Sequence, residues 1–424
     1  MINFKRLCLV LLLLAGCAPT RLQREDMPSR CETPDAAALL QAAQRSLVLH
    51  PYRPRVIYDL DDAGRAVPFH AGRLAPDALA VLSYPDPQRF AGGAADFARM
   101  AHRSFLYDNA LAVLWLVHVG DLPRARRVLA TVAALQRPDG AWGFGFNAGD
   151  EDGYYNAAYV RTGAVAWVVY ALAHYQQASH DVQFADTLAR ATQWLLAQRD
   201  AQTGLFRAGS GRWLDAAHFQ PSWPARFFST EHQIDVWFAL AALARLSPQG
   251  TDVARYAQGL RAGIYQRLWL PEERRFAQGM AVDGQPDKLS ALDASGTWAA
   301  LWLLAQGDRV RAEQVLSWVT QQHAIVASGW NGLRPYRDGA PTTWFVEGSI
   351  AEPLALSRLG HAEAAQRPWQ MLGQLACTGG LPLVYAPDWH TDFPLTPAAA
   401  PTLWFLIAGQ EIVEGSAPWL WTER

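Results

Sequence analysis

The stretch that decides the fold runs from residue 231 to residue 268. It reads EHQIDVWFALAALARL at Glu231–Leu246 and DVARYAQGLRAGIYQRL at Asp252–Leu268. Apolar residues occupy every side of the first segment, which is typical of a helix buried all round. In the second segment apolar and charged residues alternate with helical spacing, which indicates a helix with one face toward solvent. The two segments therefore predict a hairpin made of one inner and one outer helix.

The same pair recurs along the chain. Inner helices are expected at Asp108–Gly120, Arg161–Gln176, Glu231–Leu246, Asp293–Gly307, Glu347–Gly360 and Pro397–Gln410. Outer helices are expected at Leu122–Gln136, Val182–Gln198, Asp252–Leu268, Arg309–Gln322 and Ala362–Ala376. Six inner helices surrounded by outer ones form an all-α (α/α)6 toroid, and repeats of this length are the mark of such arrays. The sixth outer helix is expected from Ala36–Leu49, ahead of the repeats.

A turn rich in glycine and aromatic residues follows each of these outer helices. Examples are DGAWGFGFN at 139–147, TGLFRAGSGRW at 203–213 and SGWNGLRPYRDG at 328–339. Because each turn leads into the next inner helix, the turns and the inner-helix N-termini share one end of the barrel. That end is the expected functional face.

Helix pairs joined by such turns resemble the six-hairpin glycosidase superfamily, which includes cellulases, unsaturated glycuronyl hydrolases and N-acylglucosamine 2-epimerases. The resemblance covers roughly residues 91–410. It implies a toroid and an activity on carbohydrates. It does not identify one family within the superfamily.

Four of the inner helices begin with an acid: Asp108, Glu231, Asp293 and Glu347. An acid at that position can simply cap free N–H groups. Four acids at one cavity mouth exceed what capping requires, and glycoside hydrolysis needs one protonated and one ionised carboxyl group. Helices that are not neighbours in the ring leave room for a sugar and a water between their side chains, which favours an inverting mechanism. We therefore expect Asp108, Glu231 and Glu347 to be catalytic, with Asp108 paired with one of the other two.

Substrate contacts are expected from polar and aromatic residues at the same end. Flat aromatic rings stack on the apolar faces of sugars. An arginine at the start of an apolar helix either pairs with a nearby acid or meets an anionic sugar. The candidates are Asn109, Trp142, Tyr159, Arg161, His232, Asp235, Asp293, Trp298, Trp344 and Trp389.

Residues 1–16 have the pattern of a lipoprotein signal peptide. Lys5 and Arg6 precede the apolar run Leu7–Leu14, which is too short to span a bilayer. The sequence Leu-Ala-Gly-Cys that ends at Cys17 resembles the bacterial lipobox, which implies cleavage before this cysteine and attachment of lipid to it. Residues 17–34 are expected to be a lipidated tether, and residues 35–424 a single toroid domain. Because residue 18 is alanine and not aspartate, the resemblance implies the periplasmic face of the outer membrane.

The net charge and the cysteine content limit which other partners and ligands the sequence predicts. The formal net charge is -2, which argues against a nucleic acid partner. Cys31 and Cys377 are the cysteines left in the mature chain, in an oxidising compartment. They flank the N-terminal outer helix and the fifth outer helix, so we predict a disulfide between them. Two scattered cysteines make no zinc site, and we expect a monomer without metal or cofactor.

Two other functions stay open from the sequence. One is a non-catalytic lipoprotein that binds a polysaccharide, or a partner, during synthesis and export. The other is a sugar epimerase or polysaccharide lyase on the same fold, since fold does not fix function. A hydrolase needs two carboxyl groups facing one cleft, whereas a binding protein needs only aromatic platforms.

The lipid anchor gives a first test. The change Cys17→Ser should abolish lipid attachment and normal signal cleavage, because the acylated thiol and the lipobox cysteine are both lost. Radiolabelled palmitate incorporation and membrane fractionation measure the two effects. Retention of the variant in membranes after an alkaline wash, with no lipid attached, would show that the protein is held by something other than this cysteine.

Overall fold

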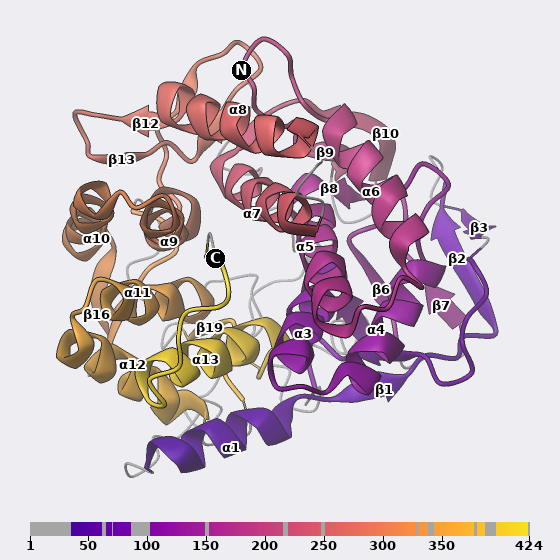
Figure 1. Ribbon diagram of the computed structural model, residues 1–424, viewed down its shortest axis with the longest axis horizontal. Helices are drawn as coiled ribbons and strands as arrows, with labels where there is room; N and C mark the ends of the chain where they lie inside the picture. Colours follow the sequence, from indigo (N-terminus) through magenta and orange to yellow (C-terminus); the bar gives the residue numbers. More distant parts are fainter. Residues whose placement is uncertain are drawn as a thin grey trace.

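The helical hairpins predicted from the sequence form a ring (Figure 1). The computed structural model describes residues 35–61, 65–69, 71–85, 102–148, 152–214, 219–246, 251–327, 330–337, 343–376, 380–385 and 396–422. Inner helices are α3 (Leu106–His118), α5 (Thr162–Ser179), α7 (Thr230–Leu246), α9 (Trp298–Ala305), α11 (Val346–Arg358) and α13 (Ala399–Ile412). Outer helices are α4 (Leu122–Ala134), α6 (Ala185–Ala197), α8 (Thr251–Arg267), α10 (Arg309–His323) and α12 (Ala362–Ala376). The all-α (α/α)6 toroid is therefore confirmed.

Two boundaries differ from the prediction. The fourth inner helix starts with a π-helical turn, η5 (Asp293–Thr297), before α9 begins. The N-terminal helix α1 covers Ala36–Ser46 and stops short of Leu49, because Leu49–Pro51 forms strand β1 and pairs with β4 (Leu79–Val81). Backbone pairing with a distant strand thus ends the helix earlier than its apolar pattern indicated.

Helix α1 takes the sixth outer place, as predicted. It packs against α13 and α12, and Figure 1 shows it beside them. Gly373 on α12 allows the close approach, because a Cβ atom there would come within 2.5 Å of the Leu39 side chain. Residues from Leu39 to Trp421 belong to one hydrophobic core, so both ends of the described chain help to close the ring.

Short antiparallel strands form a rim at one end of the barrel. Each pairs the segment before an inner helix with the turn after the outer helix of its own hairpin. The pairs are β5 (Arg103–Phe105) with β6 (Gly145–Asn147), β8 (Val160–Arg161) with β9 (Gly209–Trp213), β11 (Phe228–Ser229) with β14 (Gly279–Met280), and β18 (Trp344–Phe345) with β19 (Val384–Tyr385). A single bridge, Ala291 with Tyr336, does the same in the fourth hairpin, and a bridge of Pro382 with Pro397 joins the turn after α12 to the segment before α13 of the next hairpin.

Further strands lie outside this set of pairs. Strands β10 (Phe219–Ala225) and β15 (Pro286–Asp287) extend two of the rim sheets. The others are β2 (Val56–Leu60), β3 (Ala66–Pro68), β7 (Asp152–Tyr154), β12 (Trp269–Leu270), β13 (Arg275–Phe276), β16 (Ala324–Ala327) and β17 (Trp330–Leu333).

The rim also satisfies the first backbone N–H groups of the inner helices. In every hairpin an N–H at the start of the inner helix donates to a carbonyl in the turn after the matching outer helix. The six bonds are Leu106 to Phe144, Thr162 to Ala208, Thr230 to Gln278, Leu292 to Pro335, Val346 to Leu383 and Ala399 to Ser83. In the last bond the accepting carbonyl, that of Ser83, lies in the turn after α1. This confirms that α1 completes the sixth hairpin.

Cys17 and Cys31 lie outside the described residues, and so does Cys377. None of the helices in the described part of the chain combines the length and apolar character that a membrane span requires. The signal peptide, tether and lipid anchor thus stay predictions.

The disulfide prediction required α1 and α12 to be neighbours, and they are. Leu39 lies against Gly373, and Ser46 lies against Gly380, so the two helices run in the same direction. Cys31 precedes the first of them and Cys377 follows the second. In a parallel pair these positions are at opposite ends, so the disulfide requires residues 31–35 to turn back along α1.

Thiol counting under denaturing, non-reducing conditions tests the disulfide. If Cys31 and Cys377 are bonded, the mature protein has no free thiol, because lipid occupies Cys17. The variant Cys31→Ser should then expose one thiol. Two free thiols in the unreduced wild-type protein would show that the ring closes by packing alone.

Candidate functional site

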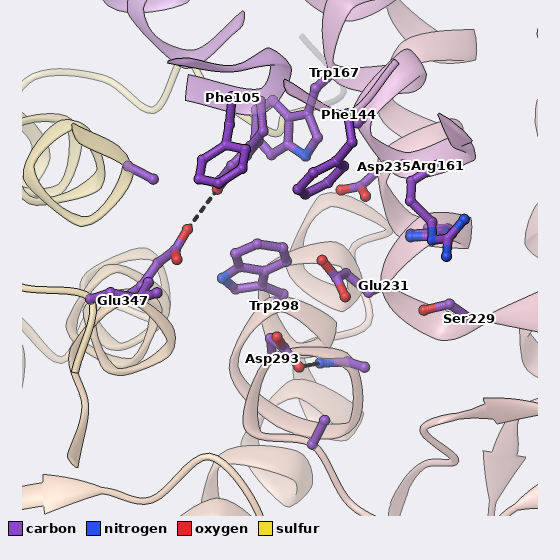
Figure 2. Close-up of a pocket in the computed structure, with 18 of the residues that line it drawn as sticks. Phe105, Phe144, Arg161, Trp167, Ser229, Glu231, Asp235, Asp293, Trp298 and Glu347 are labelled. Atoms are coloured by element: carbon purple, nitrogen blue, oxygen red, sulfur yellow. Dashed lines mark hydrogen bonds between the residues drawn. The ribbon is translucent and has the colours of Figure 1, made fainter. Parts of the chain in front are cut away.

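A pocket of about 230 Å³ opens at the rim end of the barrel. Five carboxyl groups line it, from Asp108, Glu231, Asp235, Asp293 and Glu347. Figure 2 labels the last four of them. The sequence predicted all five as site residues, on four different inner helices. Four other predicted residues, Tyr159, Arg161, His232 and Trp298, line the same pocket.

The acids of α3 and α11 do not cap their helices. Neither helix has a hydrogen-bonding side chain at its cap, and rim carbonyls accept from the N–H groups of Leu106 and Val346 instead. Asp108 and Glu347 are therefore free to face the pocket, where both are buried. Asp293 differs, because its Oδ1 accepts a hydrogen bond from the Ala294 N–H at 2.6 Å.

A directed chain of hydrogen bonds holds Glu347. The indole Nε1–H of Trp404 can only donate, and it donates to the Tyr107 hydroxyl oxygen at 2.6 Å. The Tyr107 hydroxyl must then use its own hydrogen toward Glu347 Oε1, at 3.0 Å. This bond is the dashed line at Glu347 in Figure 2. Oε1 is thus an acceptor, and Oε2 is the oxygen left to hold a proton.

Burial raises the pKa of Glu347 to about 8, and the charge of Asp108 adds to the rise, while the Tyr107 hydrogen bond opposes it. Burial also raises the pKa of Asp108, to about 7, against a hydrogen bond from Ser83. The Ser83 oxygen accepts from the Phe105 N–H at 2.8 Å, which orients its hydroxyl hydrogen toward the acid. At neutral pH Glu347 is therefore mainly a carboxylic acid, able to donate a proton.

Glu231, Asp235 and Asp293 form a second group of carboxyls. Burial is the main cause of the raised pKa of each. Asp293 and Asp235 raise the pKa of Glu231 further, and Asp293 does the same for Asp235. Carboxyls that interact in this way share protons and titrate as a unit. Once one carboxyl of this group is ionised, its charge makes the other two harder to ionise.

Gly163 lets α5 approach this group. A Cβ atom there would come 2.5 Å from Cδ2 of His232 and 2.6 Å from Oδ2 of Asp235. Among the described residues, Asp235 Oδ1 and His232 Nδ1 are buried without a hydrogen-bond partner. Burial and the neighbouring Arg161 charge lower the pKa of His232 to about 3, so the ring is neutral. Both atoms are available to the hydroxyls of a ligand.

Arg161 does not pair with an acid among the described residues, contrary to one of the two expectations. Its Nη1 donates to the carbonyls of Val160 at 2.8 Å, Ser210 at 2.9 Å and Gly211 at 3.2 Å. The guanidinium lies 3.9 Å from the ring centre of Tyr159. The rim backbone thus holds this cation in place and uses much of its donor capacity.

Aromatic rings make the apolar surface of the pocket. Trp167 and Trp298 lie deep in the barrel, and Phe105, Phe144 and Phe345 line the walls nearer the rim. The buried indole N–H of Trp298 has no hydrogen-bond partner within the described part of the chain. Figure 2 shows Trp298 between Glu347 and Glu231. A sugar stacked on this ring would lie between the two acids.

Three predicted substrate residues lie elsewhere, so these expectations were wrong. Asn109 is fully buried, donates to Ser104 Oγ and the Phe105 carbonyl, and accepts from the Val81 N–H. Trp142 is fully buried and donates to the Val132 carbonyl. Trp344 is buried and donates to Ser349 Oγ. In each case the side chain is packed beneath the rim and forms its hydrogen bonds there. Trp389 lies outside the described residues.

Sequence reasoning missed the groups that support the acids. Tyr107 had a signal, since it directly precedes Asp108 at the start of an inner helix. Trp167 and Trp404 lie within apolar helices, where periodicity does not separate a pocket residue from a core residue. No group of three potential ligands in the described part of the chain has the geometry of a metal site.

Solved structures show what this architecture is similar to. A D-mannose isomerase aligns with a TM-score of 0.60 and 11% identity, over 91% of this chain and 100% of its own. A glycosidase in complex with glucose aligns with a TM-score of 0.56 and 13% identity, over 90% and 99%. The chain has the six-hairpin glycosidase fold. A sugar epimerase from a ruminal bacterium aligns over 74% of this chain and 89% of its own, with a TM-score of 0.52 and 10% identity.

At these identities the likeness extends to the six-hairpin fold and leaves the activity open. No family model matches the sequence, and no curated protein matches it. The chemistry of this toroid therefore has to be inferred from the pocket.

The raised pKa of Glu347 predicts how stability depends on pH. The group titrates at about 8 in the folded protein and at 4.5 without its surroundings. As pH rises through this window the unfolded chain releases the proton first, so the free energy of unfolding falls. Urea unfolding of wild type and Glu347→Gln across the window measures the effect. The variant should lose less stability with pH. Equal pH dependence of the two proteins would contradict the assignment.

Proposed function

We propose that the protein is a glycoside hydrolase that acts on the end of a carbohydrate chain. The observation that carries this proposal is a pair of carboxyl groups, those of Glu347 and Glu231, on either side of Trp298 in one pocket. The chain from Trp404 through Tyr107 orients Glu347, and burial keeps this carboxyl protonated at neutral pH. Glu231 belongs to a group of carboxyls that share charge. Glycoside hydrolysis requires one protonated and one ionised carboxyl group, and the proposal gives these roles to Glu347 and Glu231.

In the proposed reaction Glu347 Oε2 gives its proton to the glycosidic oxygen as the bond from that oxygen to the anomeric carbon breaks. Glu231 takes a proton from a water whose oxygen bonds to the same carbon from the other side. One water is consumed. Glu231 then releases its new proton to solvent, and Glu347 takes one up from solvent. Helices α7 and α11 have α9 between them. Acids on helices that are not adjacent suit an inverting displacement.

The shape of the pocket supports action at a chain end. Its volume is small for a ligand site. Trp167 and Trp298 lie at its inner end, and Trp404 and Trp421 pack against them in the barrel core. A long glycan cannot pass through this layer, so a sugar has to enter and leave by the rim.

The charge of the pocket disfavours acidic sugars. Five carboxyl groups line it, and Arg161 donates to three backbone carbonyls. A sugar carboxylate would meet like charge there, and among the described residues that line the pocket Arg161 is the one cation that could offset it. A neutral sugar can donate hydroxyl groups to Asp235 Oδ1 and His232 Nδ1, and an amino sugar can also offset the shared negative charge. We therefore place the substrate among neutral or amino sugars.

The location belongs to the same proposal. A lipid on Cys17 would hold the toroid at the cell envelope, with residues 18–34 as the tether. The natural substrate would then be a polysaccharide of the envelope, or one in transit across it.

A panel of neutral, amino and uronic acid oligosaccharides tests the activity. The purified protein should release one sugar at a time from a neutral or amino member. Mass spectrometry should show one added water per cleavage, and proton NMR should show an inverted anomeric centre. An isomerised product of unchanged mass would mark an isomerase or epimerase, and an unsaturated product a lyase. If the protein binds an oligosaccharide of the panel but leaves all of them unchanged, it is a binding protein.

The acids are tested by Glu347→Gln and Glu231→Gln. Either change should lower kcat by about 10²–10⁴-fold, the usual contribution of an acid or base. Glu352→Gln is a matched control, because Glu352 lies on the same helix as Glu347 and burial raises its pKa to about 7. The kcat/KM of wild type should decline above a pH of about 8, where Glu347 loses its proton. Wild-type rates in both site variants would exclude the pair.

A further inference from the structure

The C-terminal segment 413–422 returns into the centre of the barrel. Figure 1 shows it extending from α13 into the middle of the ring. Leu420 and Trp421 are fully buried, and both belong to the hydrophobic core. The segment thus fills the barrel below the pocket, although its sequence has no helical periodicity.

Polar bonds from several inner helices fix the backbone of this segment. The Trp421 N–H donates to the Tyr170 hydroxyl of α5 at 3.0 Å. Arg358 of α11 donates to the carbonyls of Leu420 at 2.7 Å and Trp421 at 3.1 Å. The same guanidinium pairs with Glu411 of α13 at 2.7 Å, with both side chains buried. Charged groups are rarely buried unless they have such a role.

The backbone of Trp421 has a φ of +54°. This left-handed conformation is costly for any side chain and would suit glycine better. A tryptophan at this position therefore indicates that its ring is needed. The ring contacts four others, at centroid distances of 5.2 Å to Trp167, 4.9 Å to Phe238, 5.4 Å to Trp298 and 5.3 Å to Trp404.

Three of these four rings contact the acids of the pocket or their partners. Trp404 begins the hydrogen-bond chain that ends on Glu347 Oε1. Trp167 makes a hydrogen bond with Asp235 that lowers the pKa of that carboxyl. Trp298 separates Glu347 from Glu231 (Figure 2). One side chain thus lies behind both groups of acids without lining the pocket itself.

We infer that Trp421 is a positioning residue, which sets the acid and base sides of the pocket by packing against Trp404, Trp167 and Trp298. The predicted effect of Trp421 on the reaction rate rests on the proposed function. Its predicted effect on the titration of Glu347 rests on the structure alone. If the ring is lost, Trp404 and Tyr107 lose their support, and the hydrogen bond to Glu347 loosens. Because that bond holds the Glu347 carboxyl toward its ionised form, its loss shifts the titration of Glu347 upward.

The test titrates Glu347 in the whole protein by infrared difference spectroscopy of the carboxylic acid band, assigned with Glu347→Gln. Tyr107→Phe removes the hydrogen bond directly and sets the reference shift. Trp421→Ala should shift the Glu347 midpoint in the same upward direction, and Trp421→Phe should shift it less. In the Tyr107→Phe background Trp421→Phe should have no further effect, because both changes act through one chain.

Trp419→Ala is the matched control. Trp419 belongs to the same segment but stacks on His118, with a centroid distance of 4.1 Å, away from the acids. This change should leave the Glu347 midpoint in place. If Trp421→Ala fails to fold, the comparison of Trp421→Phe with Trp419→Ala decides. An unchanged midpoint in the folded Trp421 variants, or equal shifts in both backgrounds, overturns the inference.

Rates separate this inference from the proposed function. On a substrate from the panel, Trp421→Ala should lower kcat by about 10²-fold, as expected for misplaced catalytic groups, with a smaller change in KM. If no substrate is cleaved by wild type, the proposed function fails, and the infrared shift still decides the positioning role. If wild type cleaves a substrate and the Trp421 variants match it in kcat and midpoint, only the positioning role fails.

Discussion

The structure depends on six equivalent backbone hydrogen bonds at the rim. Each one joins the start of an inner helix to the turn after the outer helix of the same hairpin, so the outer partner brings an acceptor to the start of the inner helix. The bonds supply acceptors that capping side chains would otherwise provide. The first turn of each inner helix therefore does not need capping side chains, and its residues can have another role. Five acids occupy these turns or the one that follows, and they face a common space.

Gathering acids in that space has an energetic consequence. Each carboxyl is removed from water, and the charge of another carboxyl raises the pKa of Glu231, Asp235 and Glu347 further. Desolvation and like charge both favour protonation, so the group cannot be fully ionised at neutral pH. Hydrogen bonds then orient an acid and determine which of its oxygens can hold a proton. For Glu347 a chain of three side chains settles the orientation, because a tryptophan at its far end can only donate.

Helical periodicity was enough to predict the ring, and it located the inner helices to within a few residues. Periodicity reports which side of a helix is buried, and the inner helices are buried on all sides, so it could not separate pocket from core. Asp108 and Glu347 were found because four inner helices begin with an acid at the same end of the barrel, which is more than capping requires. Asn109 and Trp142 were misassigned because their side chains donate hydrogen bonds to neighbouring carbonyls below the rim. Trp421 was missed because its segment has no repeat, and its role follows only from contacts that are distant in sequence.

The place of residues 420 and 421 has a consequence for biogenesis. The barrel interior is lined by helices that are synthesised from α3 to α13, and the side chain that fills it comes after all of them. During synthesis the first hairpins can form while the central space is still open to water. The centre of this core can therefore be filled only after every helix of the ring has been synthesised. A chain shortened by a dozen residues would retain every helix of the ring and still lack its centre.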